Sequence, residues 1–232
     1  MSKMSWDTTG NRFFHTGVSD VALFMQTGSS ATNDGYVTGI PWSGVTGITQ
    51  SPDGADAQNF YADNIKYLSI RAKENWKGTI KCFQYPTAFK KALGKKELVD
   101  GSGIWVGQQS RKAFGLVWKT KYGNDTDGED HGYIIHIAYG LTAGPSEEED
   151  NTTNETPEIN EFSFDLESTP ASDPNNRVEP TSYVEFNSTE LAPAKLKSLM
   201  EHIYGRDADV EHSITALDPT MPTLTNIGNW IA

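Results

Sequence analysis

The sequence is poor in cysteine, in basic side chains and in long apolar runs. Cys82 is its only cysteine, so no disulfide can form within the chain. Lysine and arginine number 19 against 31 aspartates and glutamates, and the formal net charge of −12 argues against a protein that grips nucleic acid. The longest apolar run near the start, at residues 21–25, is too short for a signal peptide, and nothing approaches membrane-spanning length. We therefore expect a protein that is made in a cytoplasm and stays soluble there.

The composition that is present indicates a globular β protein. Hydrophobic residues make up 36% of the 232 residues and aromatic residues 11%, which suffices for a full core. Short apolar runs alternate with 21 glycines and 11 prolines, a pattern typical of turn-rich β architecture. We expect one β domain at residues 17–205, a flexible N-terminal arm at 1–16 and a C-terminal arm at 206–232. Residues 142–158 are strongly acidic and predict a mobile surface loop within the domain.

Local patterns predict the individual elements. Residues 34–50 suggest a bent strand or a bulged hairpin, and Ser-Pro and Asp-Gly signals predict a loop at residues 51–59. Pro86 and Gly94 suit the ends of a short helix. The remaining strands are expected at residues 18–27, 64–73, 76–86, 103–109, 111–122, 133–139, 161–169 and 181–189.

One strong amphipathic helix is expected at residues 193–204, before the capping Gly205. Its apolar stripe follows helical spacing and predicts a face packed on the outer side of the sheet. The stripe consists of Ala192, Leu196, Leu199, Met200 and Ile203.

The strands at 111–122 and 133–139 are expected to pair as a long-looped hairpin. In the first, Phe114, Leu116 and Trp118 share one face, since alternate residues of a strand point the same way. In the second, Tyr133, Ile135, Ile137 and Tyr139 oppose Ile134, His136 and Ala138.

The acidic stretch GNDTDGEDHG, residues 123–132, between these strands invites three chemical interpretations. An EF-hand loop would need acidic ligands where Gly123 and Ile134 stand. A metal site using His131 and His136 fails because five residues of extended chain point the two rings to opposite faces. Paired glycosidase carboxylates stay open as an alternative, although any chain with 31 acids offers such pairs. Strand alternation on both sides favours a solvated hairpin loop.

Other motifs give no chemistry. The stretch GSGIWVG, residues 101–107, runs into a strand and not into a helix N-terminus that could hold phosphate. No P-loop, serine nucleophile elbow or His-Glu-X-X-His motif is present. The six tryptophans (Trp6, Trp42, Trp76, Trp105, Trp118 and Trp230) could stack on sugars, but they fit a core or an interface better. We predict no catalytic residue, metal site or cofactor.

Four segments in order resemble the major tail proteins, or tail-tube proteins, of long flexible-tailed bacteriophages and prophages of Gram-positive hosts. They cover most of residues 35–205 and read YADNIKY (61–67), GQQSRKAFGL (107–116), GNDTDGEDHGYIIHIAYG (123–140) and LMEHIYG (199–205). The resemblance implies a mainly β fold, an antiparallel β-sandwich or half-barrel with one flanking amphipathic helix and a short second helix. The acidic insert at 147–154 and both termini depart from the family's pattern.

The resemblance also implies a structural virion protein without catalysis. Family members form hexameric rings that stack around a tape-measure protein, between tail-initiator or distal tail proteins and a terminator, as the conduit for DNA ejection. The residues alone leave two alternatives: a β-sandwich module that binds host carbohydrate, and a glycosidase.

Two loops at the ends of the expected sheet are the candidates for contacts between subunits or rings. Long loops at the end of a sheet can reach a neighbouring ring, and paired sheet edges would bury backbone groups that otherwise invite aggregation. The candidates are Ser51, Pro52, Asp53, Gly54, Tyr61, Asp63 and Asn64 in the first region, and Asn124, Asp125, Asp127, Asp130 and His131 in the second.

Overall fold

The computed structural model describes residues 4, 8–27, 35–54, 56–148, 152, 159–175, 177–209 and 212–231. The described chain is mainly β, as predicted, with two α-helices and one 3-10 helix. Its strands are β1 Phe13–Met25, β2 Ile40–Pro41, β3 Val45–Gln50, β4 Asp53–Gly54, β5 Ala57–Ala62, β6 Ile65–Arg71, β7 Glu74–Asn75, β8 Lys77–Cys82, β9 Lys96–Glu97, β10 Trp105–Val106, β11 Phe114–Asn124, β12 Gly128–Ala143, β13 Phe162–Ser168 and β14 Tyr183–Asn187. Its helices are η1 Thr87–Lys91, α1 Pro193–Tyr204 and α2 Leu224–Trp230.

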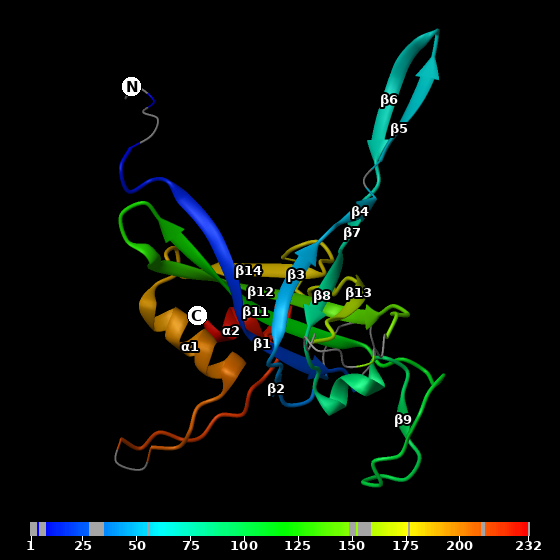
Figure 1. The fold of residues 1–232 in the computed structure, drawn as a ribbon. Coiled ribbons are helices and arrows are strands. Elements are labelled where there is room, and N and C mark those ends of the chain that lie inside the picture. Colours follow the sequence, from blue (N-terminus) through cyan, green and yellow to red (C-terminus); the bar gives the residue numbers. More distant parts are fainter. Residues whose placement is uncertain are drawn as a thin grey trace.

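Eight strands form one antiparallel sheet in the order β2-β1-β11-β12-β13-β8-β3, with β14 also paired to β12 (Figure 1). The long strand β12 serves both halves of the sheet. Its residues 134–138 pair with β14, and its residues 141–143 pair with β13. Because β1 also contacts β3, the sheet curls back toward itself. Of the β-sandwich and the half-barrel that the resemblance implied, the curled sheet corresponds to the half-barrel.

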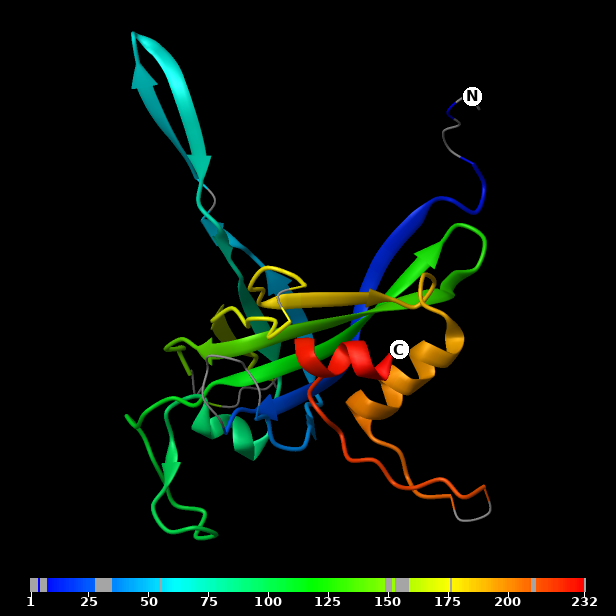
Figure 2. The ribbon, with the colours of Figure 1, turned by 180° about the vertical axis from the view of Figure 1, so that it is seen from behind.

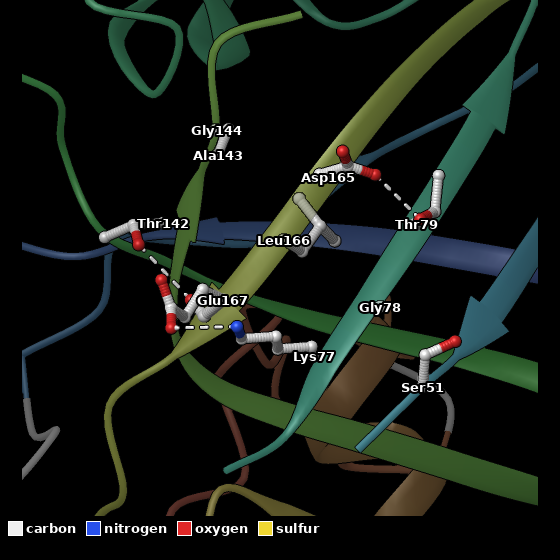
Figure 3. Close-up of a pocket in the computed structure, with 10 residues that line it drawn as sticks. All are labelled: Ser51, Lys77, Gly78, Thr79, Thr142, Ala143, Gly144, Asp165, Leu166 and Glu167. Atoms are coloured by element: carbon white, nitrogen blue, oxygen red, sulfur yellow. Dashed lines mark hydrogen bonds and ion pairs between the residues drawn. The ribbon is translucent and has the colours of Figure 1, made fainter. Parts of the chain in front are cut away.

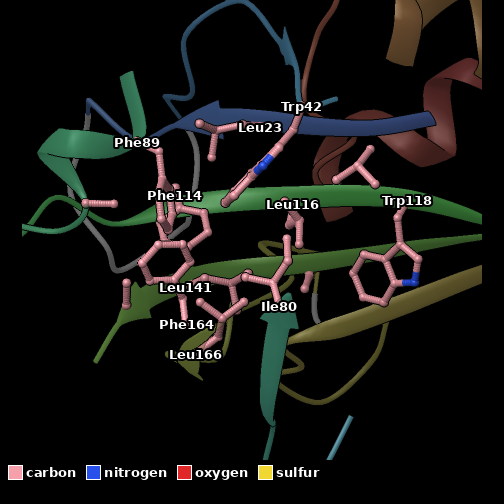
Figure 4. Packing of buried hydrophobic residues seen from close by; sticks show 14 of the residues in the cluster. Leu23, Trp42, Ile80, Phe89, Phe114, Leu116, Trp118, Leu141, Phe164 and Leu166 are labelled. Atoms are coloured by element: carbon pink, nitrogen blue, oxygen red, sulfur yellow. The ribbon is translucent and has the colours of Figure 1, made fainter. Parts of the chain in front are cut away.

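The main core lies inside the curled sheet (Figure 4). Phe89 of η1 is at its centre and packs against Trp42, Phe114 and Phe164, with ring centroids 4.5, 5.3 and 5.2 Å away. In β13, Phe164 and Leu166 are buried in this core, whereas Asp165 between them is exposed.

A second core lies on the opposite face of the sheet, beneath α1 and α2 (Figure 2). The 111–122 and 133–139 strands divide their residues between the two cores as alternation predicted. Val117, Ile135, Ile137 and Tyr139 belong to the second core. Leu199 and Ile203 of α1 cover them, and both are fully buried.

The helices match the predictions in part. Helix α1 has the predicted bounds, but Ala192 is exposed and so lies outside the buried stripe. The helix expected at 86–94 is a 3-10 helix, η1. Helix α2 was not predicted. It packs on α1, where the Trp230 ring stacks on His202 with centroids 4.5 Å apart.

Two expected loops are strands instead. The loop prediction at 51–59 is wrong, because β4 and β5 occupy much of it. The prediction of a long acidic loop between β11 and β12 is also wrong, because Asn124 pairs with Gly128 and only residues 125–127 form the turn. Glu129 and Asp130 therefore belong to β12. The body of the acidic segment expected as a loop, residues 149–151 and 153–158, lies outside the described residues, as does Trp6.

Candidate assembly surface

Strands β5 and β6 form a hairpin that projects from the body of the molecule (Figures 1 and 2). We call this hairpin, residues 57–71, the arm. Every residue of both strands is exposed to solvent. A two-stranded hairpin without a covered face is marginally stable in water. Within the described part of its own chain, neither face of the arm is covered.

A two-residue turn closes the arm. Ala62 pairs with Ile65, and the intervening Asp63 and Asn64 have φ angles of 51° and 62°. Two successive positive φ angles define the turn whose twist matches a β-hairpin, and asparagine and aspartate tolerate that conformation better than most residues. The predicted residues Asp63 and Asn64 thus lie at the outermost point of the arm.

The arm has one apolar face and one polar face. Its register shifts between Phe60 and Tyr61, which pair with Leu68 and Lys66, so Tyr67 is the extra residue of a bulge. Cross-strand partners share a face, and the bulge brings Ile65 onto the same face as Leu68. The apolar face consists of Phe60, Ile65, Leu68 and Ile70, all exposed.

The opposite face of the arm is polar. There Ser69 Oγ donates a hydrogen bond to Asn59 Oδ1 at 2.8 Å. Lys66 pairs with Tyr61 on this side, and the Tyr61 ring is 70% exposed. One apolar and one polar face is the pattern of a strand pair that packs against something on one side only.

The base of the arm contains the other residues predicted in this region. Asp53 and Gly54 pair with Asn75 and Glu74, and the Lys77 ammonium contacts Asp53 Oδ2 at 2.9 Å. That hydrogen-bonded ion pair lowers the pKa of the exposed Asp53 carboxyl. Gly54 has a φ of 104°, a conformation that favours glycine. Ser51 donates its backbone N–H to the Lys77 carbonyl at 2.8 Å.

The second predicted group lies at the β11–β12 turn. Asn124 is buried, and its Oδ1 accepts hydrogen bonds from the backbone N–H groups of Thr126 and Asp127 at 3.1 and 2.6 Å. Asp125 Oδ1 accepts the N–H of Gly10 at 2.8 Å, which holds the N-terminal segment against the turn. His131 Nδ1 lies 3.1 Å from Asp127 Oδ2.

The predicted residues therefore fall into two places. Ser51, Pro52, Asp53, Gly54, Tyr61, Asp63 and Asn64 belong to the arm and its base, and Asn124, Asp125, Asp127, Asp130 and His131 belong to the β11–β12 turn. Sequence reasoning missed the apolar face of the arm. The available signal was the Asp63-Asn64 pair between two β-rich runs.

A shallow pocket on the solvent side of β8 and β13 contains carboxylates (Figure 3). Asp165 accepts a hydrogen bond from Thr79 Oγ1 at 2.8 Å, and Glu167 lies 3.7 Å from the Lys77 ammonium. Each carboxylate is thus held by β8, and together they make a polar cross-strand ladder. Among the residues that the structure describes, no three His, Cys, Asp or Glu side chains are grouped so that they could hold a metal ion.

The buried titratable groups have structural partners. His136 is 7% exposed, Thr120 Oγ1 lies 2.7 Å from its Nε2, and Tyr183 contacts its Nδ1. Burial lowers the pKa of His136 to about 4. Burial also raises the pKa of the Cys82 thiol to about 11.

Three of the six tryptophans that could stack on sugars are buried: Trp42, Trp76 and Trp118. Trp105 is partly exposed, and the Lys90 ammonium lies 5.0 Å from its ring centroid. No helix in the described part of the chain is long and apolar enough to cross a membrane.

A family model described as "Phage tail tube protein" matches residues 21–194, well over half of the chain. No curated protein sequence matches. Among solved structures, a chain of the anti-feeding prophage baseplate is 9% identical, covers 79% of this chain and 97% of that chain, and gives a TM-score of 0.37. A chain from the sheath/tube terminator of an extracellular contractile injection system is 12% identical, with coverage of 79% and 99% and a TM-score of 0.32.

Proposed function

The chain belongs to the phage tail tube protein family, and from that premise we propose that its copies form hexameric rings that stack into the tube of a long flexible tail. Its place is then the tail of the virion, after synthesis in the cytoplasm of a Gram-positive host. The tube encloses a tape-measure protein, starts on tail-initiator or distal tail proteins and ends at a terminator. It conducts the genome into the host and performs no catalysis.

The arm is the observation that supports self-assembly most directly. Its apolar face, formed by Phe60, Ile65, Leu68 and Ile70, is exposed and extends away from both cores of its own chain. Burying a large apolar side chain contributes about 1.5–3 kcal/mol. Four such side chains on one face are a strong driving force for contact with another copy.

The charge of the chain suits a conduit for DNA. The formal net charge is −12, and acidic side chains that faced the bore would repel phosphates within about 8 Å at physiological salt. DNA would then pass without specific binding. The polar ladder of Asp165 and Glu167 shows that one sheet face already presents carboxylates to solvent.

Electron microscopy of the purified full-length chain tests this function. We expect negative-stain images to show rings or tubes, and addition of tail-initiator proteins to increase tube number. Sedimentation velocity on the same samples should show a concentration-dependent shift from monomer to large species. A chain that stays monomeric at every concentration, with initiator proteins present, would contradict the proposal.

A further inference from the structure

A second apolar projection lies at the other end of the molecule. Strands β9 and β10 pair through Glu97 with Trp105 and Lys96 with Val106. We call residues 96–106 the distal loop. Four of its side chains are exposed: Leu98, Val99, Ile104 and Val106, the first two by 65% and 64%.

The distal loop is an ordered structure. Leu98 donates its N–H to the Ile104 carbonyl at 2.9 Å, and Glu97 Oε1 accepts the N–H of Gly103 at 2.7 Å. At its root, Gln109 donates its N–H to the Gly94 carbonyl at 2.8 Å. Backbone bonds that fix the loop while its apolar side chains face solvent favour a preformed contact surface.

The arm and the distal loop occupy opposite ends of the molecule and the same side of it. Figures 1 and 2 show this from two directions, with the arm at one end and β9 at the other. A second copy displaced along the long direction of the molecule therefore brings its distal loop to the arm of the first. A contact between two different surfaces that repeats by such a displacement does not close into a ring, which is the geometry of a filament.

The charges of the two surfaces are complementary. Lys66 and Arg71 outnumber Asp63 in the arm, and Glu97 and Asp100 outnumber Lys96 in the distal loop. The arm is therefore net positive and the distal loop net negative, although the chain as a whole is strongly acidic. Lys66 and Arg71 lie on the polar face of the arm, so this opposite charge guides the approach of the two surfaces and does not act across the apolar contact itself.

We infer that the apolar face of the arm packs on the apolar side chains of the distal loop of the next copy along the tube. The inference rests on the proposed function and adds to it the surface that receives the arm. It requires every contact along the tube to run in one direction, from the arm of one copy to the distal loop of the next.

Disulfide cross-linking of the full-length chain tests this contact, because its single native cysteine, Cys82, is fully buried. The double variant Leu68→Cys/Val99→Cys, oxidised under assembly conditions, should give a ladder of multimers on non-reducing gels. A reductant should collapse the ladder to monomer. A second pair, Ile70→Cys/Ile104→Cys, should behave alike.

The matched control moves the arm cysteine to the polar face. Ser69→Cys/Val99→Cys should give at least tenfold less ladder, because position 69 points away from the partner. Each single variant should stop at dimers. Micrographs of the same samples distinguish the proposed contact from the proposed tube function. The contact is wrong, and the tube function stands, if tubes form but neither cysteine pair gives a ladder. The same holds if the control variant gives an equally strong ladder. If the native chain forms no ring or tube, the proposed function and the contact both fail.

Discussion

Trp118 of β11 and His136 of β12 are cross-strand partners whose rings stack, with centroids 5.1 Å apart and planes inclined by 14°. Trp118 belongs to the main core and is almost fully buried, and His136 beside it is buried as well. The neighbours Thr120 and Tyr183 satisfy both ring nitrogens. Burial disfavours the charged imidazolium, so His136 makes the stability of the fold depend on pH.

Lowering the pH should destabilise the protein through His136. The pKa of His136 is about 4 in the folded chain and 6.5 in the unfolded one, so between these values the unfolded chain binds the proton first. Stability present above pH 6.5 is lost as the pH falls toward 4, by up to about 1.4 kcal/mol per pH unit. Thermal melts should show a shallower loss over this window for His136→Gln. Both proteins contain the same carboxylates, so the contribution of these groups to the pH dependence cancels in the comparison. Identical slopes of stability against pH would show that His136 does not cause the loss.

Replacing the apolar face of the arm should abolish tubes without unfolding the subunit. Phe60 and Leu68 are cross-strand partners and exposed, so Phe60→Ser/Leu68→Ser should change the free energy of unfolding by less than about 0.5 kcal/mol. Micrographs should show monomers where the native chain forms tubes. The control Asn59→Ala/Ser69→Ala alters the polar face and should still assemble. Normal tubes from the first variant would exclude the arm as the assembly surface.

Shortening a side chain in the second core should lower the free energy of unfolding far more than shortening one on the surface. Leu199 of α1 is fully buried, and Leu199→Ala should lower the free energy of unfolding by about 2–5 kcal/mol. Lys195→Ala lies one helical turn earlier and is exposed, so its effect should stay within about 0.5 kcal/mol. Denaturant unfolding of both variants measures the difference. Equal midpoints would mean that α1 does not cover the sheet.

The β11–β12 turn should depend on Asn124. Its Oδ1 accepts two backbone N–H groups in a buried position, and Asn124→Ala leaves them without that acceptor. We expect the free energy of unfolding to fall by about 1–2 kcal/mol and hydrogen exchange at residues 125–127 to become faster. Asp130→Ala, at an exposed position of the neighbouring strand, should leave both unchanged. Unaltered exchange in Asn124→Ala would show that the backbone alone fixes the turn.

Strict alternation made much of the main sheet predictable. In β11, β12 and β13 one or both faces meet a core, so burial imposes a period of two on residues such as Phe114, Leu116 and Trp118. Helix α1 was predictable for the same reason, because Leu199 and Ile203 repeat at helical spacing over a buried face. In each case, the contacts that stabilise the element select its residues.

Of the arm, only β6 was predicted, within the strand expected at residues 64–73; β5 and the apolar face were not. The bulge at Tyr67 breaks the alternation, so Ile65 and Leu68 share a face although three residues apart. Ser-Pro and Asp-Gly signals just before it predicted a loop. Helix α2 was not predicted for another reason, because it is short and includes Gly228. Its stability comes from tertiary contacts, such as the Trp230 ring on His202, that local sequence does not encode.

The β11–β12 turn was predicted at the right place in the sequence but with the wrong length. Asn124, Asp125 and Asp127 were assigned to a solvated acidic loop, whereas Asn124 is buried and organises a tight turn. Residue types that favour turns mark where the chain reverses, but not whether the reversal takes three residues or ten.

The uncovered arm also governs how unassembled subunits behave. While few tubes have formed, the apolar face of the arm in each newly made copy is exposed to water and can bind any apolar surface. Non-specific aggregation then competes with tube growth. Which process dominates depends on the number of growing tube ends that are present when synthesis begins. The number of tube ends that can accept subunits, more than the strength of any single contact, would set the fraction of subunits that is lost to aggregation.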